Sequence, residues 1–66
     1  MEYDGTKIHS LRTEQGLSLY QLAVKMGNIV TPMAINNWER GNSSPDAAKL
    51  GKLANALGVE VTYFFV

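Results

Sequence analysis

A chain of 66 residues without a cysteine has to hold its fold together by apolar packing. No disulfide can staple it, and no cysteine can bind zinc or serve as a nucleophile. Its single histidine, His9, cannot build a multi-histidine metal site and is expected to be a solvated helix residue. Residues of the hydrophobic set make up 45% of the chain, enough for one modest core. We therefore expect one domain, residues 1–66.

Apolar residues recur at helical spacing in successive segments, each bounded by residues typical of helix ends. The pattern predicts five helices, over residues 6–15, 18–26, 32–40, 46–57 and 61–65. Ile35 and Trp38, three residues apart, should form the inner face of the third helix. The last segment is ambiguous, because the β-branched and aromatic residues of VEVTYFFV locally favour a strand. A fifth helix suits the chain better, so we predict a compact all-α fold.

Capping residues support these boundaries. Ser18, with a glutamine three residues later, gives the capping-box pattern of a helix start. Thr31 is a good N-cap, and Pro32 follows at the first helical position, where its missing N–H costs nothing. Asp46 is expected to cap the fourth helix. Gly51 is unusual inside that helix, and we predict that it marks a position of close packing.

Several short motifs follow one another in a characteristic order: LR at 11–12, LS..QLA at 17–23, the turn glycine Gly27, WERG at 38–41, Pro45 and KLANALGV at 52–59. Their order and spacing resemble the helix-turn-helix family of phage Cro and repressor proteins and the related xenobiotic-response-element regulators. The resemblance runs from about Ile8 to Phe65. It implies a lambda-repressor-like domain with its helix-turn-helix in the second and third helices, and double-stranded DNA as the partner.

The third helix of such a fold enters the major groove, where each base pair presents a distinct pattern of donors and acceptors. The resemblance implies that Pro32, Met33 and Asn37 face the bases, and Asn36 lies beside them, so these four residues are the base-contacting candidates. Asparagine can pair with adenine through N6 and N7, whereas Pro32 and Met33 offer apolar contact, for example with a thymine methyl group. The alternative for Asn36 and Asn37 is two solvated polar residues on an exposed helix. Asparagine is a poor helix former, however, which favours a function for the pair.

The candidates for contact with DNA phosphates lie at helix ends and in the loop that follows the third helix: Ser18, Thr31, Arg40, Asn42, Ser43 and Ser44. Backbone N–H groups at a helix start attract anions, although Ser18 and Thr31 also fit plain N-capping. Arg40 fits equally well as a solvated cation favoured by the helix dipole.

Arg12 and Glu39 have a different expected role. The resemblance implies that they form a partly buried ion pair between the first and third helices, which would hold the third helix at its angle. Tyr20, outward on the second helix, could contact the DNA backbone or cover a neighbouring apolar residue, and the sequence leaves both alternatives open.

The C-terminal residues carry more apolar surface than one small domain can bury. The resemblance implies a homodimer that reads two half-sites about one helical turn apart. We expect the dimer surface to include four residues of the tail: Val61, Tyr63, Phe65 and Val66. The alternative is that the tail only closes the open end of the core.

Two classes of function remain. The first is a sequence-specific transcription regulator, a repressor. The second is a protein-interaction module, or an antitoxin-like partner, with weak or no specific DNA binding. Net charge +0, Leu19 at a position where the family often has glutamine, and a turn about two residues longer than usual favour the second. The pairs Thr31–Pro32 and Asn36–Asn37, together with Arg40, favour the first, which is our prediction. The sequence indicates no catalytic group, no cofactor, no metal and no membrane segment, and we expect a cytoplasmic protein.

Overall fold

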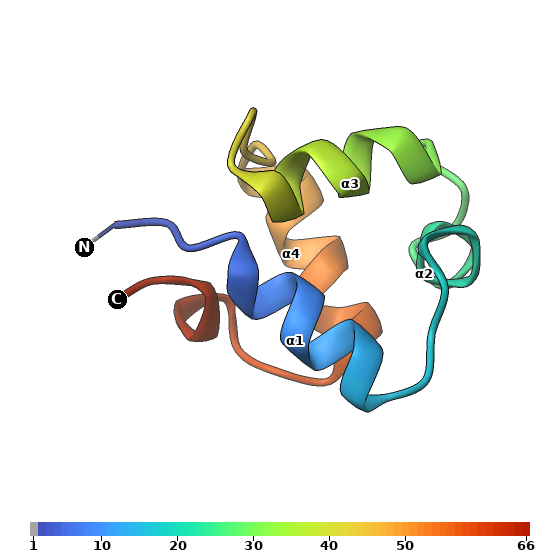
Figure 1. Cartoon of the computed structure of the whole chain (residues 1–66), viewed down its shortest axis with the longest axis horizontal. Coiled ribbons are helices and arrows are strands. Elements are labelled where there is room, and N and C mark those ends of the chain that lie inside the picture. The colour runs from blue at the N-terminus through green and yellow to red at the C-terminus, as the bar shows by residue number, and fades with distance from the viewer. Residues whose placement is uncertain (1) are drawn as a thin grey trace.

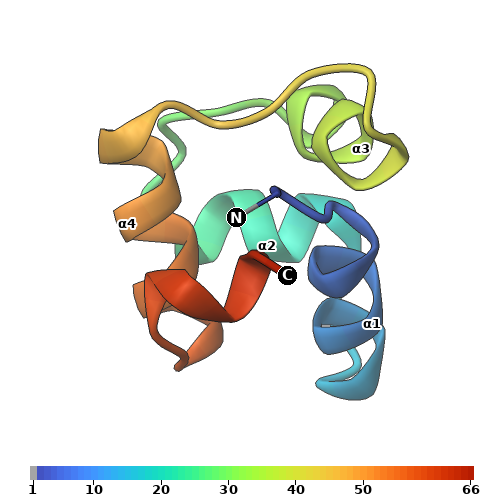
Figure 2. The ribbon, with the colours of Figure 1, turned by 90° about the vertical axis from the view of Figure 1, so that its left-hand side faces the viewer.

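The computed structural model describes residues 2–66, and within that range the regular elements are helices, apart from one isolated β-bridge. Its elements are α1 (Thr6–Glu14), α2 (Leu19–Lys25), α3 (Pro32–Arg40), α4 (Ala47–Leu57) and the 3-10 helix η1 (Val61–Phe64). Figures 1 and 2 together show α3 stacked above α1 on one side of the molecule, with α4 on the opposite side. The four α-helices begin and end within one residue of the ranges that the sequence indicates. No helix in this range is both long and apolar enough to cross a membrane.

Side chains cap three of the helices at their first turn. Ser18 accepts a hydrogen bond from the Gln21 N–H, and the Gln21 side chain accepts one from the Ser18 N–H, which completes the capping box of α2. Thr31 Oγ1 accepts from the Ala34 N–H at 3.1 Å. Asp46 caps α4 in the same way. These local contacts explain why the helix starts could be predicted from the sequence.

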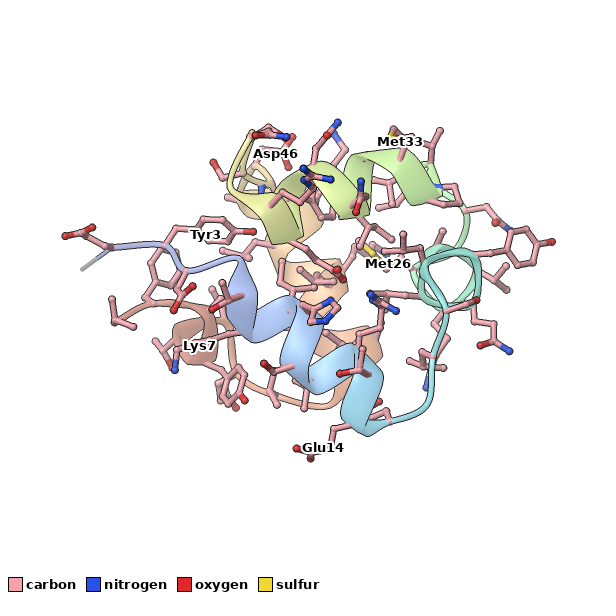
Figure 3. All side chains as sticks on the ribbon, in the orientation of Figure 1. Tyr3, Lys7, Glu14, Met26, Met33 and Asp46 are labelled. Carbon is pink, nitrogen blue, oxygen red and sulfur yellow. The ribbon has the colours of Figure 1, made fainter. Side chains whose placement is uncertain are left out.

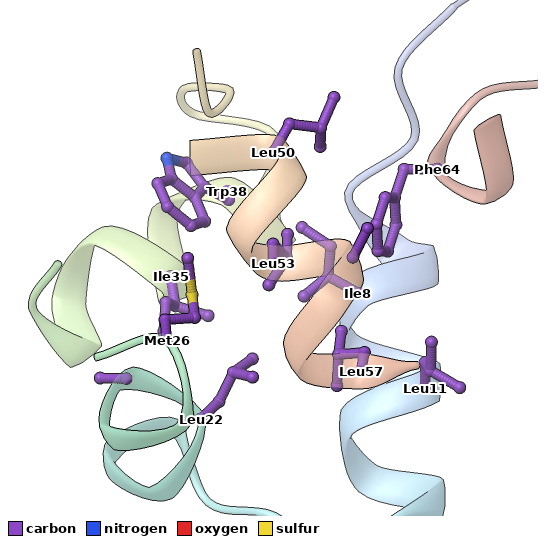
Figure 4. Close-up of a cluster of buried hydrophobic side chains, with 12 residues drawn as sticks. Ile8, Leu11, Leu22, Met26, Ile35, Trp38, Leu50, Leu53, Leu57 and Phe64 are labelled. Carbon is purple, nitrogen blue, oxygen red and sulfur yellow. The ribbon is translucent and has the colours of Figure 1, made fainter. Parts of the chain in front are cut away.

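One apolar core lies between the helices (Figure 4). Every helix contributes to it, and so does η1. Its twelve buried residues are Ile8, Leu11, Leu22, Ala23, Met26, Ile35, Trp38, Leu50, Leu53, Ala54, Leu57 and Phe64. Because α1 and α2 both contact α3 across this core, the position of α3 is fixed by packing along its inner side.

The prediction of a fifth α-helix over residues 61–65 is wrong. Within residues 2–66 there are four α-helices, and the tail forms only the four-residue 3-10 helix η1. The chain then turns extended, and Phe65 pairs with Tyr3 in an antiparallel β-bridge. Asp4 N–H donates to the Phe64 carbonyl at 2.8 Å. The tail therefore satisfies its backbone groups by pairing with the N-terminal segment, which a continued helix would prevent. Figure 2 shows the two ends of the chain close together.

The prediction of close packing at Gly51 is also wrong. A Cβ atom added at Gly51 would meet no heavy atom within 4 Å, so α4 has room for a side chain there. The glycine that does pack closely is Gly5, the N-cap residue of α1. A Cβ there would overlap the carbonyl oxygen of Trp38.

Candidate nucleic-acid interface

Helices α2 and α3 pack on one another and are joined by a short turn (Figure 1). The turn begins at Gly27 and Asn28, whose φ angles are 87° and 59°. Glycine adopts this left-handed conformation freely and asparagine tolerates it, so these two residue types suit the reversal of the chain. Ile29 and Val30 follow, and Thr31 then caps α3. The turn thus leaves the N-terminal end of α3 next to α2.

The sides of α3 differ sharply in exposure. Ile35 and Trp38 are buried in the core, as their spacing predicts. Met33 is 63% exposed and stands out from the outer side of the helix (Figure 3). Asn36 and Asn37 are half-buried. The outer side of α3 therefore offers one apolar side chain and two amides to a partner.

The remaining base-facing candidate, Pro32, is half-buried at the first position of α3. Arg40 is the last residue of α3 and is exposed. No ion pair of residues 2–66 involves it, so its charge is available to a partner. At a helix C-terminus this cation also interacts favourably with the helix dipole. Both sequence-based interpretations of Arg40 stay compatible with its position.

The other phosphate candidates are exposed but lie at separate places. Ser18 is at the start of α2 and Thr31 at the start of α3, and both hydroxyls already act as N-caps. Asn42, Ser43 and Ser44 are exposed in the loop that leaves the C-terminal end of α3 (Figure 1). The phosphate candidates thus lie at the start of α2, at the start of α3 and in the loop after α3.

The structure brings Arg12 and Glu39 together between α1 and α3. Arg12 Nε donates to Glu39 Oε2 at 2.6 Å, and Arg12 Nη2 donates to Oε1 at 3.0 Å. Arg12 Nη1 also donates to the carbonyl of Leu17 at 2.8 Å, ahead of α2. Both residues are buried. This fork-shaped pair ties α3 to α1 with a defined geometry.

His9 joins this pair, which sequence reasoning missed. Its Nδ1 lies 3.1 Å from Glu39 Oε1 and 3.2 Å from Arg12 Nη2. A guanidinium can only donate and a carboxylate only accept, so Nδ1 must carry a proton in order to bond Glu39. Burial raises the pKa of the Glu39 carboxyl, but hydrogen bonds and charges from Arg12 and His9 outweigh it and hold that pKa below its ordinary value.

The N-terminal segment contacts the same C-terminal end of α3 that the Arg12–Glu39 pair holds. The Tyr3 hydroxyl donates to the Trp38 carbonyl at 3.1 Å, and Gly5 lies against the same peptide group. Burial, together with the nearby charges of Asp4 and Glu39, raises the pKa of Tyr3 to about 12. The phenol therefore remains a hydrogen-bond donor at every physiological pH. No local pattern in the sequence signals this contact, because the two segments are 35 residues apart.

Comparison with known proteins identifies the domain. The family model HTH_3, described as helix-turn-helix, matches residues 8–64. The chain belongs to the HTH_3 helix-turn-helix family. This confirms the resemblance to Cro and repressor proteins that the sequence motifs indicate.

Two similar proteins are longer than this chain. It is 39% identical over 57 residues to "Multiprotein-bridging factor 1" of Candida glabrata, covering 86% of this chain and 36% of that protein. A crystal structure of an "HTH_3 family Transcriptional Regulator" from Vibrio cholerae superposes with a TM-score of 0.80 at 36% identity. That match covers 92% of this chain and 33% of the other. The chain thus spans about a third of each relative.

The tail of the HTH_3 domain presents three of the four predicted dimer residues to solvent. Val61, Tyr63 and Val66 are exposed. Phe65 is half-buried, and its ring meets the Tyr3 ring edge-on at 6.2 Å between centroids. Phe65 therefore packs within the domain, and the exposed apolar surface of the tail comes from Val61, Tyr63 and Val66.

Proposed function

We propose that this chain is a sequence-specific module for binding double-stranded DNA in transcription regulation, and that it lays α3 in the major groove. One observation carries the proposal. The outer side of α3 bears Met33 and Asn37, while its inner side is held by core packing and by the Arg12–Glu39 pair. A groove-reading helix needs this combination of exposed recognition groups and a fixed orientation.

The exposed groups on and around α3 are proposed to make two kinds of contact with DNA, to bases and to phosphates. Pro32, Met33, Asn36 and Asn37 are the proposed base contacts. Arg40, the loop at 42–44 and the capped starts of α2 and α3 are the proposed phosphate contacts, because hydroxyls, amides and N-terminal N–H groups bind phosphate oxygens without reading sequence. Family membership supports a binding role rather than catalysis.

We also propose that the module acts as a homodimer and represses. A dimer would read two half-sites, and the exposed Val61, Tyr63 and Val66 supply apolar surface for a second copy. A domain that occupies the major groove over an operator excludes other proteins from it, which represses transcription. Sedimentation equilibrium tests the dimer: a monomer at high micromolar concentration, unchanged by Val66→Asp, would refute it.

Salt dependence of binding tests the DNA proposal most directly. Each phosphate neutralised by a cation adds about −0.9 to the slope of log affinity against log salt. We expect Arg40→Ala to make the slope shallower by about 0.9. Lys52→Ala is the matched control, because it removes the same charge from an exposed position of α4 that no ion pair of residues 2–66 involves. Equal slopes for the two variants would contradict Arg40 as a phosphate contact.

A second candidate function is a protein-interaction module. The net charge of +0 favours it, and so does the likeness to a protein named as a multiprotein-bridging factor. Three exposed apolar side chains on α2 and the following turn also fit a protein partner: Tyr20, Val24 and Ile29. DNA binding no stronger than that of an unrelated neutral protein would favour this function over the first.

A further inference from the structure

We infer that α3 reads A·T base pairs at the centre of its half-site, with Met33 on a thymine methyl group and Asn37 on an adenine. The inference rests on the proposed DNA-binding function and names the class of sequence that this site would recognise. It follows from the groups that the exposed side of α3 carries and from those that it does not carry.

Exposure and spacing show which side chains lie along the middle of the exposed side of α3. Met33, Asn37 and Arg40 lie at i, i+4 and i+7, so they form one stripe along α3. Asn36 lines a shallow pocket against α1 together with His9, Glu39 and Arg40, whereas Met33 and Asn37 do not line it. Its amide nitrogen also lies 3.9 Å from Met33 Sδ. Met33 and Asn37 are therefore the side chains best placed over the floor of the groove.

The first two turns of α3 lack the preferred partners of a G·C pair. Guanine is read best by the two donors of an arginine or by a lysine, and residues 31–39 contain neither. Cytosine is read by a carboxylate that accepts from N4. The only carboxylate of α3, Glu39, is buried and bonded to Arg12 and His9. Arg40 comes at the last position of α3, whereas the N-terminal residues of such a helix contact the base edges.

The groups that remain fit an A·T pair. The Asn37 amide can donate to adenine N7 and accept from N6, and no hydrogen bond within residues 2–66 occupies its side chain. The two side chains at the first turn of α3 that are proposed to face the bases are apolar, because Pro32 has no polar group and Met33 has only a thioether. Met33 projects from this turn, and its flexible thioether suits contact with a thymine methyl group.

Selection from a pool of random duplex DNA, followed by base-analogue substitution, tests the inference. We expect a recovered motif with A·T pairs at the centre of each half-site. Uracil in place of the contacted thymine removes one methyl group and should weaken binding about four-fold. In place of the contacted adenine, 7-deazaadenine removes the N7 acceptor and should weaken binding about five-fold.

Crossing the analogues with protein variants assigns each contact to its residue. Met33→Ala should abolish the effect of uracil but keep that of 7-deazaadenine, and Asn37→Ala should do the reverse. Both positions are on the outer side of α3, and the circular dichroism of each variant should match that of the parent. Asn37→Arg should shift the preference at one position from adenine to guanine, because arginine then supplies the two donors for O6 and N7.

The outcomes distinguish a failure of the A·T preference from a failure of DNA binding itself. Selection of a motif with G·C pairs at its centre, or variants that keep both analogue effects, would overturn this inference and leave DNA binding standing. Recovery of unselected sequence, with no binding above that of a neutral protein, would overturn the proposed function and this inference with it.

Discussion

The buried carboxylate of Glu39 is the residue on which the orientation of α3 depends most. Glu39→Ala leaves the Arg12 guanidinium buried without its partner, which typically costs about 3–5 kcal/mol. A domain of this size has a total stability of only about 3–10 kcal/mol, so the variant should be largely unfolded or close to it. Urea unfolding measures the loss. Glu14→Ala, the same change at an exposed position of α1, should shift stability by about 0.5 kcal/mol or less.

The lowered pKa of Glu39 also predicts a pH dependence. Its contribution is complete above the ordinary glutamate value of 4.5 and is lost as pH falls through the lower pKa of the folded state, since the unfolded chain then binds more protons. Asp4 and Asp46, whose pKa values are also lowered by hydrogen bonds, act in the same direction. The urea concentration at the unfolding midpoint should decrease as the pH is lowered below about 4.5. This decrease should be less steep in Glu39→Gln. Equal slopes for the parent and Glu39→Gln would contradict the pair's assigned role, because Asp4 and Asp46 would then account for the whole pH dependence.

At the scale of elements, two glycines give opposite predictions. Gly5→Ala forces a Cβ into the Trp38 carbonyl, so α1 and the end of α3 must separate, which should cost about 1–3 kcal/mol. Gly51→Ala places a methyl group in open space inside α4 and should stabilise the fold by about 0.5–1 kcal/mol through helix propensity. Thermal unfolding compares the two variants. Equal and small shifts would mean that α1 and α3 do not meet as described.

The sequence predicts where the helices start, but it does not predict which helices contact one another. The starts of α2, α3 and α4 depend on residues within three positions of Ser18, Thr31 and Asp46, so pattern alone locates them. Contacts made across the fold leave no such pattern. The approach of Gly5 to Trp38 and the bond from His9 to Glu39 join residues more than 29 positions apart, and both were missed. The Arg12–Glu39 pair was anticipated only through the family resemblance.

For the whole molecule, the tail is part of the core although it is not an α-helix. Phe64 is completely buried, and Phe64→Ala should cost about 3–5 kcal/mol and unfold much of the population. Val66→Ala, two residues on and 67% exposed, should change stability by about 0.5 kcal/mol or less. The far-ultraviolet circular dichroism of both variants provides the test. A folded Phe64→Ala variant with parental stability would contradict the central position of this side chain.

The sequence predicted an apolar tail but not its conformation, because two tendencies compete in it. The β-branched and aromatic residues favour extended backbone, and the resemblance favours a helix. In the structure, residues 61–64 make a 3-10 turn that buries Phe64, and Phe65 then bridges to Tyr3. Tertiary packing of one aromatic ring decides the outcome, and no window of local sequence contains that information.

The bridge between Tyr3 and Phe65 makes the chain nearly a closed ring. The backbones of Glu2 and Val66 exchange two hydrogen bonds, of 3.2 and 2.9 Å. Residues 2 and 66 therefore lie side by side (Figure 2). A linker of a few residues could therefore join them with little loss of loop entropy, and new ends could be opened elsewhere, for example at the exposed Gly16. The same geometry would let the domain sit inside a surface loop of another protein without stretching its host.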